Sequence, residues 1–564
     1  MTRARTGFGG WQCWPRSHIA LEATVQTNSQ AGNQLDRRGA TTNGHGRQPT
    51  DELRLAELIA ALSRVTDLGM GQHPEDAIRA SLLATNLARR MELGDKDVHD
   101  VYYATLLQHV GCTAYAHETA ALLGGDDVRV RAGGARIDFA NPREALPFLL
   151  FEVGKGATPL SRAHAVISAV SQGQRFDEKL SRSNCEVAVH MARRLGLGTG
   201  VQRGLNGIYE RWDGRGNPQK LSGEDIALPA RLAQVASQAV LFGGSGGPDL
   251  ALEVIRRRAG AGLDPSIADA FLRYGRELLQ EIASIDASVA AIEAEPEPRY
   301  WISEPRLDEV ARACADMVDL KSPFTHGHSV AVAELAEAAA TNLGLAATDV
   351  VCVRRAGFFH DLGRVGVPNG IWDKPGPLST SEWEQVRLHP YHSERILSRS
   401  PMLAPLAPLA GMHHERLDGS GYHRQAKAPM IPTAARLLAA ADAYQAMTQQ
   451  RPHRPALTPG AAADRLTSEA AQGRLDPETV GAVLEAAGHP PARARLGWPA
   501  SLSDREVQVL RLVARGHSNR EMARMLWISP KTAGHHVQHI YAKIGVSSRA
   551  AAAMFAMEHD LIRE

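Results

Sequence analysis

From residue 51 onward, apolar residues recur at spacings of three and four along segments rich in alanine and leucine, and glycine or proline separates one segment from the next. Alternation of apolar and polar residues with a period of two, which is typical of half-buried strands, is nearly absent. The pattern therefore predicts an all-α fold.

Two proline-rich stretches interrupt the helical pattern. AIEAEPEPRYWISEP lies near residue 300 and GHPPARARLGWPAS lies near residue 490, and both compositions are typical of linkers. A chain of 564 residues is also too long for a single core. We therefore expect a disordered tail at 1–50, helical domains at 51–295 and 301–485, a linker at 486–498 and a small C-terminal domain at 499–564.

The two larger domains share an internal repeat. GIYERWDGRGNPQK at 207–220 and GMHHERLDGSGYHR at 411–424 contain the same ERxDGxG frame, 205 residues apart. Upstream, His73 is matched with His328, 255 residues later, so the first copy is expected to contain about fifty additional residues. The repeat indicates a duplication in which the first copy has lost its histidines.

The second copy concentrates residues that bind metal ions. Nine of the 23 histidines fall between His326 and His453, and Asp442 lies in the apolar helical segment RLLAAADAYQAM, where a cation would compensate its buried charge. A lone core histidine is more often a packing residue, but seven candidates in one domain favour a metal site. Five imidazoles and two carboxylates are sufficient for two divalent transition metal ions, with Asp361 between them. The candidates are His328, His360, Asp361, His389, His413, His414 and Asp442.

Residues 321 to about 485 resemble an HD-GYP domain, the branch of the HD phosphohydrolases that hydrolyses cyclic di-GMP. The matching passages are THGHS, HDLGRVGVPNGIWDKPGPLS, RLHP, HHERLDGSGY and AADAYQAMTQQRPHR. The resemblance implies that the seven candidates bind two metal ions, and imidazole–carboxylate sites accept iron or manganese. It also implies catalytic roles for Asp361 and Arg364, and substrate binding by Arg451, Arg454, Tyr422 and Arg364.

The second copy departs from the HD-GYP pattern at four positions. Arg364 replaces the usual lysine, His423 replaces the proline of GYP, and Gln445 replaces an aspartate. Phe324 stands where some members have a glutamate for a third metal ion, so we expect two ions.

The first copy lacks the predicted ligands. His109 is followed by Val110 where His360 is followed by aspartate, and the remaining ligand positions hold Asn184, Cys185, Ile208, Tyr209 and Ser237. This copy resembles a degenerate HD-GYP-like domain. Two interpretations remain open: a partner for packing or dimerisation, or a pocket that senses a ligand.

The C-terminal segment predicts a helix-turn-helix. Ser503 with Glu506 and Ser518 with Glu521 form the capping-box pattern at two helix starts, and Ser529 precedes a third helix with proline in its first turn. A short helix, a tight turn and a longer helix match the geometry of DNA-binding helix-turn-helix proteins. From residue 499 onward there are nine Lys/Arg and six Asp/Glu, although the whole chain is nearly neutral, with 63 and 62. This balance favours phosphate contacts by this domain only.

Residues 502 to 562 resemble the LuxR-type DNA-binding domain, a four-helix fold, through LSDREVQVL, GHSNREMARML, ISPKTAGHHV and IYAKIGVSSRAAA. The resemblance implies promoter DNA as a partner. It also implies DNA contacts by Lys531, Thr532, His535, Gln538 and Lys543. A homodimer is expected, since helix-turn-helix regulators bind palindromic sites as dimers. A helical hairpin used for protein contacts is the alternative interpretation.

No stretch approaches the roughly 18 apolar residues that span a bilayer, and the first fifty residues contain no apolar run of signal-peptide length. We therefore expect a cytoplasmic protein without membrane contact.

The leading hypothesis is a LuxR-type regulator whose HD module hydrolyses a cyclic dinucleotide, most readily cyclic di-GMP. The first alternative is a transcription factor whose HD module senses a nucleotide without turnover. The second is an HD enzyme acting on ordinary nucleotides, with DNA binding only for localisation.

Overall fold

The computed structural model describes residues 53–155, 158–490, 500, 502–559 and 561. The predicted tail at 1–50 and positions 491–498 of the predicted linker lie outside these residues. Helices dominate, and the strands in the described part of the chain are β1 (Leu53–Arg54) and β2 (Trp301–Ile302), which pair antiparallel. The prediction of an all-α fold is confirmed. The described residues up to His489 form one compact unit, and those from Pro490 onward form a second.

Within its described residues, the first copy comprises eleven helices and one short 3-10 helix. The helices are α1 (Leu55–Gly69), α2 (Asp76–Arg90), α3 (Asp95–Leu106), α4 (Ala116–Leu123), α5 (Asp127–Gly134), α6 (Pro142–Phe151), α7 (Pro159–Arg194), α8 (Thr199–Asn206), α9 (Leu228–Arg258), α10 (Pro265–Ala283) and α11 (Ala287–Ala294), with η2 at Gly223–Asp225.

The second copy comprises ten helices and three 3-10 helices. The helices are α12 (Glu304–Asp319), α13 (His328–Asn342), α14 (Ala347–Phe359), α15 (Asn369–Trp372), α16 (Thr380–Arg387), α17 (His389–Leu397), α18 (Ala407–Gly411), α19 (Thr433–Thr448), α20 (Pro459–Ala471) and α21 (Pro477–Ala486). The 3-10 helices are η3 (Leu362–Gly366), η4 (Ala404–Leu406) and η5 (Ala428–Met430).

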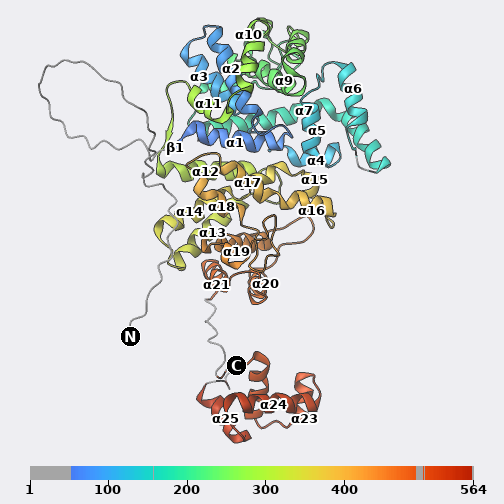
Figure 1. Ribbon diagram of the computed structural model, residues 1–564. Coiled ribbons are helices and arrows are strands. Elements are labelled where there is room, and N and C mark those ends of the chain that lie inside the picture. Colours follow the sequence, from blue (N-terminus) through green and yellow to red (C-terminus); the bar gives the residue numbers. More distant parts are fainter. Residues whose placement is uncertain (1–52, 156–157, 491–499, 501, 560, 562–564) are drawn as a thin grey trace, which may run out of the picture. The chain divides into compact units, whose positions relative to one another are not determined.

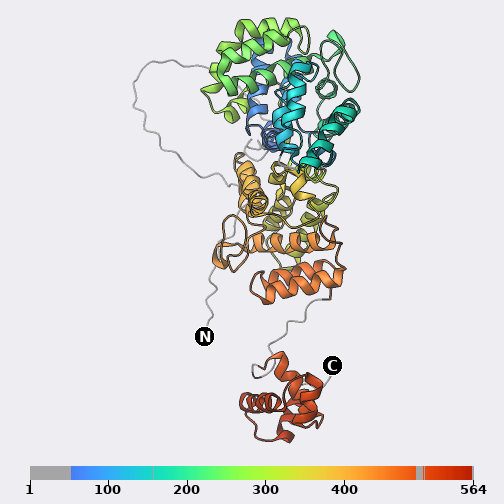
Figure 2. The same ribbon diagram turned by 90° about the vertical axis from the view of Figure 1, so that its right-hand side faces the viewer.

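The two copies share one hydrophobic core. Figures 1 and 2 show the first copy, blue to green, lying against the second, yellow to orange. Helix α1 runs along the junction and packs on η3, where a Cβ on Gly69 would lie only 2.4 Å from Cγ1 of Val365. The cluster of buried apolar residues continues from Leu53 in the first copy to Leu484 in the second. Any boundary between the copies therefore falls inside one packed body.

The ERxDGxG frame builds the same loop in both copies. Glu210 is buried and accepts the backbone N–H groups of Gln219 at 2.6 Å and Leu221 at 3.1 Å. In the second copy, buried Glu415 accepts the N–H groups 205 residues further along, at 3.0 Å and 2.8 Å. A buried backbone amide needs a partner, so the frame is retained in both copies because it folds the loop.

A second shared contact corrects the upstream match between the copies. The carboxylate of Asp67 accepts the N–H of Ala77 at 3.0 Å, and that of Asp319 accepts the N–H of Ser329 at 2.8 Å. These equivalent contacts are 252 residues apart, not 255. The match of His73 with His328 was therefore wrong, and Asp76, the first residue of α2, corresponds to His328.

The C-terminal unit contains α22 (Asp504–Ala514), α23 (Asn519–Leu526), α24 (Pro530–Ile544) and α25 (Arg549–Glu558). Both predicted capping boxes are present at the starts of α22 and α23. Ser529 caps α24 by accepting the N–H of Thr532 at 3.0 Å. The unit has its own apolar core, formed by residues such as Leu510, Met522 and Ile540.

Candidate metal centre

The structure brings the seven predicted ligands together. They come from the start of α13 (His328), the end of α14 (His360, Asp361), the start of α17 (His389), the segment after α18 (His413, His414) and the middle of α19 (Asp442). All are buried except His414, whose side chain is 21% exposed. Segments separated by more than a hundred residues thus converge on one site, as the resemblance implied.

Two groups of three residues form the centre, and Asp361 belongs to one group and also faces the other. In each group the atoms that bind metal ions lie within 4.8 Å of one another. Asp361 Oδ1 lies 3.3 Å from His389 Nε2 and 3.7 Å from His413 Nε2, whereas Oδ2 lies 3.7 Å from His360 Nε2. The two oxygens therefore face different groups. The groups are His328, His360 and Asp361, and His389, His413 and His414.

Asp442 also reaches both groups. Its Oδ1 lies 3.1 Å from His328 Nε2, and its Oδ2 lies 3.5 Å from His414 Nδ1. Helix α19 therefore presents one carboxylate to two histidines that are 86 residues apart in the chain.

Backbone carbonyls orient three of the imidazoles. Nδ1–H of His360 donates to Gly357 O at 2.7 Å, and the Nδ1–H groups of His389 and His413 each donate to the carbonyl three residues earlier, at 2.6 Å. This bond fixes the tautomer and leaves Nε2 as a lone-pair donor towards the centre. Nε2 of His360 is buried with no hydrogen-bond partner. A buried imidazole nitrogen with a free lone pair, close to carboxylates, is suited to bind a cation.

The electrostatics of the centre favour the metal-binding forms of its residues. Burial alone would raise the carboxyl pKa values, but neighbouring imidazoles and Arg364 outweigh it, so the pKa of Asp361 lies well below its usual range. The pKa of Asp442 is lowered in the same way by its histidine neighbours. Burial lowers the pKa of His413 to about 3. Charged carboxylates and neutral imidazoles are the forms that bind metal ions.

Two of the predicted basic residues lie beside the centre, and one is turned away. Arg364 donates to Asp361 Oδ2 at 2.9 Å and lies over the ring of Trp372, with Cζ 4.0 Å from the ring centroid. Arg451 donates to Phe324 O at 2.9 Å and is close enough for the charge of Arg364 to add to the lowering of its pKa, which burial reduces to about 10. Arg454 instead donates to backbone carbonyls at the end of α19, including Met447 O at 3.1 Å.

Tyr422 covers the outer side of the centre. Its ring packs on His414, with ring centroids 4.3 Å apart, and lies 6.1 Å from the ring of His389. The next residue, His423, has both ring nitrogens buried without a hydrogen-bond partner in the described part of the chain. The GYH passage therefore lies at the rim of the centre.

Two residues of the centre escaped the sequence-based prediction. Gln449 accepts from Nδ1–H of His328 at 2.9 Å and from Arg451 at 3.2 Å, which links the first ligand to a basic residue. Trp372 supports Arg364 through its ring and through an indole N–H bond to Arg364 O at 3.1 Å. The proximity of Gln449 to the RPHR passage was the one available signal.

The corresponding positions of the first copy hold no three-ligand group among the described residues. A Cβ on Gly111 would lie 1.9 Å from Asn184 O, and one on Gly363 would lie 2.1 Å from His389 O, so these glycines correspond. The predicted match of His109 with His360 therefore shifts by one residue, and His109 corresponds to Asp361. The counterparts of the seven ligands are Asp76, Gln108, His109, Asn184, Ile208, Tyr209 and Ser237.

The polar groups of the first copy bond to one another. Ser237 donates to Gln108 in place of the contact between Asp442 and His360. The Tyr209 hydroxyl lies 3.2 Å from Asn184 Nδ2 and 3.2 Å from Cys112 Sγ. Hydrogen bonds within the protein thus link several of these positions in the first copy.

The predicted DNA-binding residues lie on α24. Lys531, Thr532, His535 and Gln538 are exposed there, whereas Val537 and Ile540 face the core. Lys543 forms an ion pair with Glu506 at 2.7 Å. All five predicted residues therefore lie exposed on α24, and Lys543 also contacts α22 through its ion pair.

A helical body with a His–Asp pair, further histidines and a second aspartate converging on one centre defines the HD class of metal-dependent phosphohydrolases. The HD domain family model matches residues 140–267 and 312–479. The chain belongs to this family, with one match in each copy. The model of bacterial regulatory proteins of the luxR family matches residues 500–556. The predicted tandem of HD domains with a LuxR-type helix-turn-helix domain is thus confirmed.

Relatives extend this assignment. The 3'3'-cGAMP-specific phosphodiesterase 3 of Vibrio cholerae is 30% identical over 439 residues, which cover 77% of this chain and 94% of the relative. A cyclic di-GMP phosphodiesterase of Thermotoga maritima is 34% identical over 31% of this chain and 48% of its own length. A crystal structure of a cyclic GMP-AMP-specific phosphodiesterase of V. cholerae matches 78% of this chain and 99% of that chain, with 26% identity and a TM-score of 0.55. The chain is an HD-GYP-type phosphohydrolase.

No helix in the described ranges is long and apolar enough to span a membrane.

Proposed function

We propose that this protein is a metal-dependent phosphodiesterase for 3'3'-cyclic dinucleotides that also binds promoter DNA. The observation that carries the proposal is the position of Asp361, whose two oxygens face two separate histidine groups beside Arg364. Such an arrangement suits a phosphodiester, since it combines cation ligands with a guanidinium that pairs with phosphate oxygens.

Two divalent ions, iron or manganese, fit the residues present. The group of His328, His360 and Asp361 would hold one ion, and the group of His389, His413 and His414 would hold the other. Asp442 is placed to contribute to both. Ions bound there would supply a hydroxide at neutral pH and polarise phosphate oxygens.

The protein residues orient the substrate. Arg364, which donates to Asp361, and Arg451, which donates to Phe324 O, would bind the phosphate oxygens. Tyr422 forms a wall beside His414 and would limit where a nucleotide base can lie. Arg454 holds the end of α19 in place, which supports the position of Arg451 three residues earlier.

The first candidate substrate is 3'3'-cGAMP, because the relative that matches both copies is named for this substrate. Cyclic di-GMP is the second candidate, since several relatives that match about a third of this chain are named for it. The proposed order of candidates thus differs from the HD-GYP resemblance, which implied cyclic di-GMP as the first candidate.

The C-terminal unit is proposed to bind promoter DNA through Lys531, Thr532, His535, Gln538 and Lys543, which are exposed on α24. Because half-sites of such operators are related by two-fold symmetry, a homodimer is the expected form. Neither part requires a membrane, and a cytoplasmic location suits both activities.

Turnover tests the proposal. The protein is purified without oxygen, its metal content is measured, and it is incubated with 3'3'-cGAMP, cyclic di-GMP and a panel of linear and cyclic nucleotides. We expect linear dinucleotide or mononucleotide products by mass spectrometry from the wild type and none from Asp361→Ala. Full metal content without conversion of any nucleotide would refute the enzyme.

A sensor without turnover is the second candidate function. The observation that favours it is His423, which occupies the position of the GYP proline and has both ring nitrogens buried without a hydrogen-bond partner among the described residues. Isothermal titration distinguishes the two candidates: a sensor binds the cyclic dinucleotide stoichiometrically, the nucleotide is recovered unchanged, and its binding alters the affinity of the protein for DNA.

A further inference from the structure

A buried ion pair joins the degenerate first copy to the loop that leads to the metal centre. Lys321 begins the α12–α13 connection, and its Nζ lies 3.4 Å from Oδ2 of Asp127, the first residue of α5. The side chains are 3% and 0% exposed. Burial lowers the pKa of Lys321, and Asp127 opposes that effect. A buried charge of this kind is stable only while its partner is in place.

The same carboxylate also holds α15. Oδ1 of Asp127 accepts the backbone N–H of Asn369 at 2.7 Å. The next residue, Gly370, donates its N–H to Gly125 O at 2.8 Å, and a Cβ there would lie 2.3 Å from that oxygen. The first copy thus fixes the start of α15 through backbone bonds with no space for adjustment.

Asp373 closes the network between these two segments of the second copy. It accepts from the hydroxyl of Ser322 at 2.6 Å and from the side chain of Asn369 at 3.1 Å, and it pairs with Nδ1 of His117 at 2.8 Å. His117 belongs to α4 of the first copy. Two helices of the degenerate copy therefore hold the α12–α13 connection and α15 in a fixed relation.

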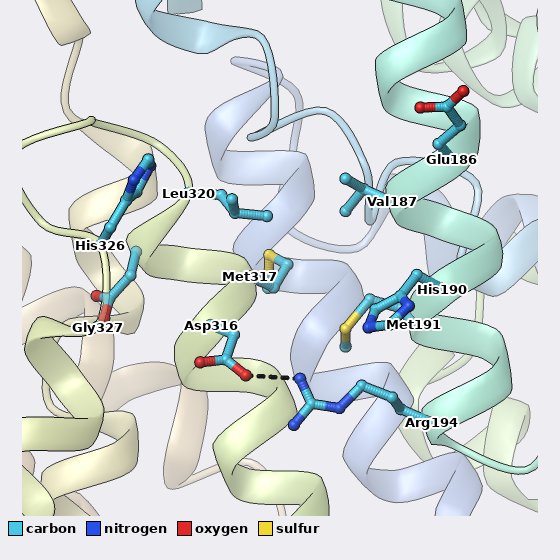
Figure 3. Close-up of a pocket in the computed structure, with 11 residues that line it drawn as sticks. Glu186, Val187, His190, Met191, Arg194, Asp316, Met317, Leu320, His326 and Gly327 are labelled. Atoms are coloured by element: carbon cyan, nitrogen blue, oxygen red, sulfur yellow. Dashed lines mark hydrogen bonds and ion pairs between the residues drawn. The ribbon is translucent and has the colours of Figure 1, made fainter.

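The α12–α13 connection leads to Arg451 and His328. Phe324 donates its N–H to Ser322 at 3.3 Å and accepts from Arg451 at 2.9 Å, and His328 begins the next helix. The connection also borders a cavity. A cavity of about 440 Å³ separates Leu320, His326 and Gly327 from α7, as Figure 3 shows. The network around Asp127 therefore holds the connection from one end, and Thr325 stabilises its turn by donating to Asp319 O and Ser322 O, each at 3.0 Å.

Helix α15 leads to Arg364 and Asp361. It ends at Trp372, whose indole N–H donates to Arg364 O and whose ring supports the Arg364 guanidinium. That guanidinium in turn donates to Asp361. One carboxylate of the first copy is thus connected through two short paths to both arginines that face the centre.

We propose that Asp127 is a positioning residue for the active site, and that the degenerate first copy acts as an activating subunit within the same chain. Asp127 holds Arg451 and His328 through Lys321, and holds Arg364 through Asn369 and Trp372. The catalytic consequence rests on the proposed phosphodiesterase activity, whereas the mechanical consequence does not depend on it.

Two substitutions separate the two paths. Asp127→Asn removes the charge that compensates Lys321 but keeps an acceptor for Asn369 N–H, and Asp127→Ala removes both. The matched control is Asp264→Asn, because Asp264 is also fully buried in the first copy and pairs with Arg231 at 2.7 Å, away from the second copy. Metal content, far-UV circular dichroism and the thermal midpoint are measured for every variant.

Hydrogen exchange gives a readout without substrate. We expect backbone amides of residues 321–327 to exchange at least about tenfold faster in Asp127→Asn, and those of 369–373 to join them in Asp127→Ala. Asp264→Asn should leave both segments unchanged. Unchanged exchange in both Asp127 variants, or equal acceleration in the control, would overturn the proposal. If Asp127→Ala does not fold, the exchange of residues 321–327 in Asp127→Asn alone tests the proposal.

Kinetics tests the catalytic consequence. In Asp127→Asn, we expect kcat/KM to fall about tenfold with metal content retained, as is usual for outer partners of a metal centre. Arg451→Ala should cost less in the Asp127→Asn background than in the wild type, because both changes act on the same guanidinium. Strict additivity would indicate a general loss of stability and refute a positioning role. A wild type that converts no nucleotide would refute the proposed function, and the exchange data would still decide on Asp127.

Discussion

The two HD copies differ in the residues that face their centres and agree in the residues that build the backbone around them. Glu210 in the first copy and Glu415 in the second each accept hydrogen bonds from two equivalent backbone N–H groups. In contrast, Asp442 of the second copy faces two histidines, and its counterpart in the first copy is Ser237. The first copy has thus lost its ligands without losing its loop. The comparison separates two roles that one sequence motif combines: the ERxDGxG frame folds the chain, and the neighbouring histidines supply the chemistry.

Replacing Asp442 by serine, its counterpart in the first copy, has the largest expected effect. The change removes the carboxylate that lies 3.1 Å from His328 and 3.5 Å from His414. Because even outer partners of metal ligands are worth about 10–100-fold, loss of this carboxylate should lower turnover at least a hundredfold. Turnover and bound metal are measured together, the latter by mass spectrometry.

The reciprocal change, Ser237→Asp, is the control. It should restore neither metal binding nor activity to the first copy, because Gln108 and Ile208 still occupy ligand positions. Full turnover by Asp442→Ser would contradict the assignment of the centre to the second copy.

Glu210→Ala and Glu415→Ala should destabilise the protein to a similar degree. Each leaves two backbone N–H groups without their acceptor, and the loss should be about 1–3 kcal/mol for the pair because the amides are only partly buried. Chemical unfolding followed by circular dichroism measures the change in the free energy of unfolding. Asp418→Ala, which removes one hydrogen bond from exposed Ser420 N–H in the same frame, should change it less, by about 0.5–1.5 kcal/mol. A large loss in one copy only would break the structural equivalence of the two loops.

Arg451→Ala and Arg454→Ala should separate substrate binding from support of α19. Loss of a hydrogen bond to a charged phosphate is worth about 1.5–3 kcal/mol, so Arg451→Ala should raise KM by about 10–100-fold. Arg454 donates to carbonyls at the end of α19, and Arg454→Ala should mainly lower the thermal midpoint. Steady-state kinetics and thermal unfolding on both variants test this. An equal rise in KM would place both guanidinium groups on the substrate.

Gln449→Ala has the smallest expected effect. It removes the acceptor for Nδ1–H of His328 and one contact of Arg451. We expect metal affinity to fall about tenfold, the lower end of the range for such partners. Titration of the metal-free protein with Mn²⁺ measures it. An unchanged affinity would indicate that His328 is oriented by α13 and Asp442 alone.

Much of the centre could be predicted from the sequence because each ligand carries a local signal. HDLG follows an apolar helical run, HH precedes a glycine-rich turn, and Asp442 interrupts an alanine-rich helix. The helix starts of the C-terminal unit were predictable for the same reason, since Ser503 and Ser518 form capping boxes with residues only three positions away.

Contacts between distant segments could not be predicted in this way. Asp127 and Lys321 are 194 residues apart, and neither lies in a motif that indicates its partner. The pairing of β1 with β2 depends on two residues from each copy. The sequence match of His109 with His360 was wrong by one residue for a similar reason. Insertions between the motifs make the alignment of the two copies ambiguous, and the close backbone contacts of Gly111 and Gly363 resolve it.

The shared core also limits how the gene can change. The sequence of residues 301–485 resembles a self-contained enzyme domain. A shortened chain that begins there would expose the apolar surface that α1 covers, and Lys321 would lose its ion pair with Asp127. The first copy has lost most residues of ligand type at these positions while keeping its helices. The result is a duplicate that is dispensable as a catalyst and indispensable as scaffolding.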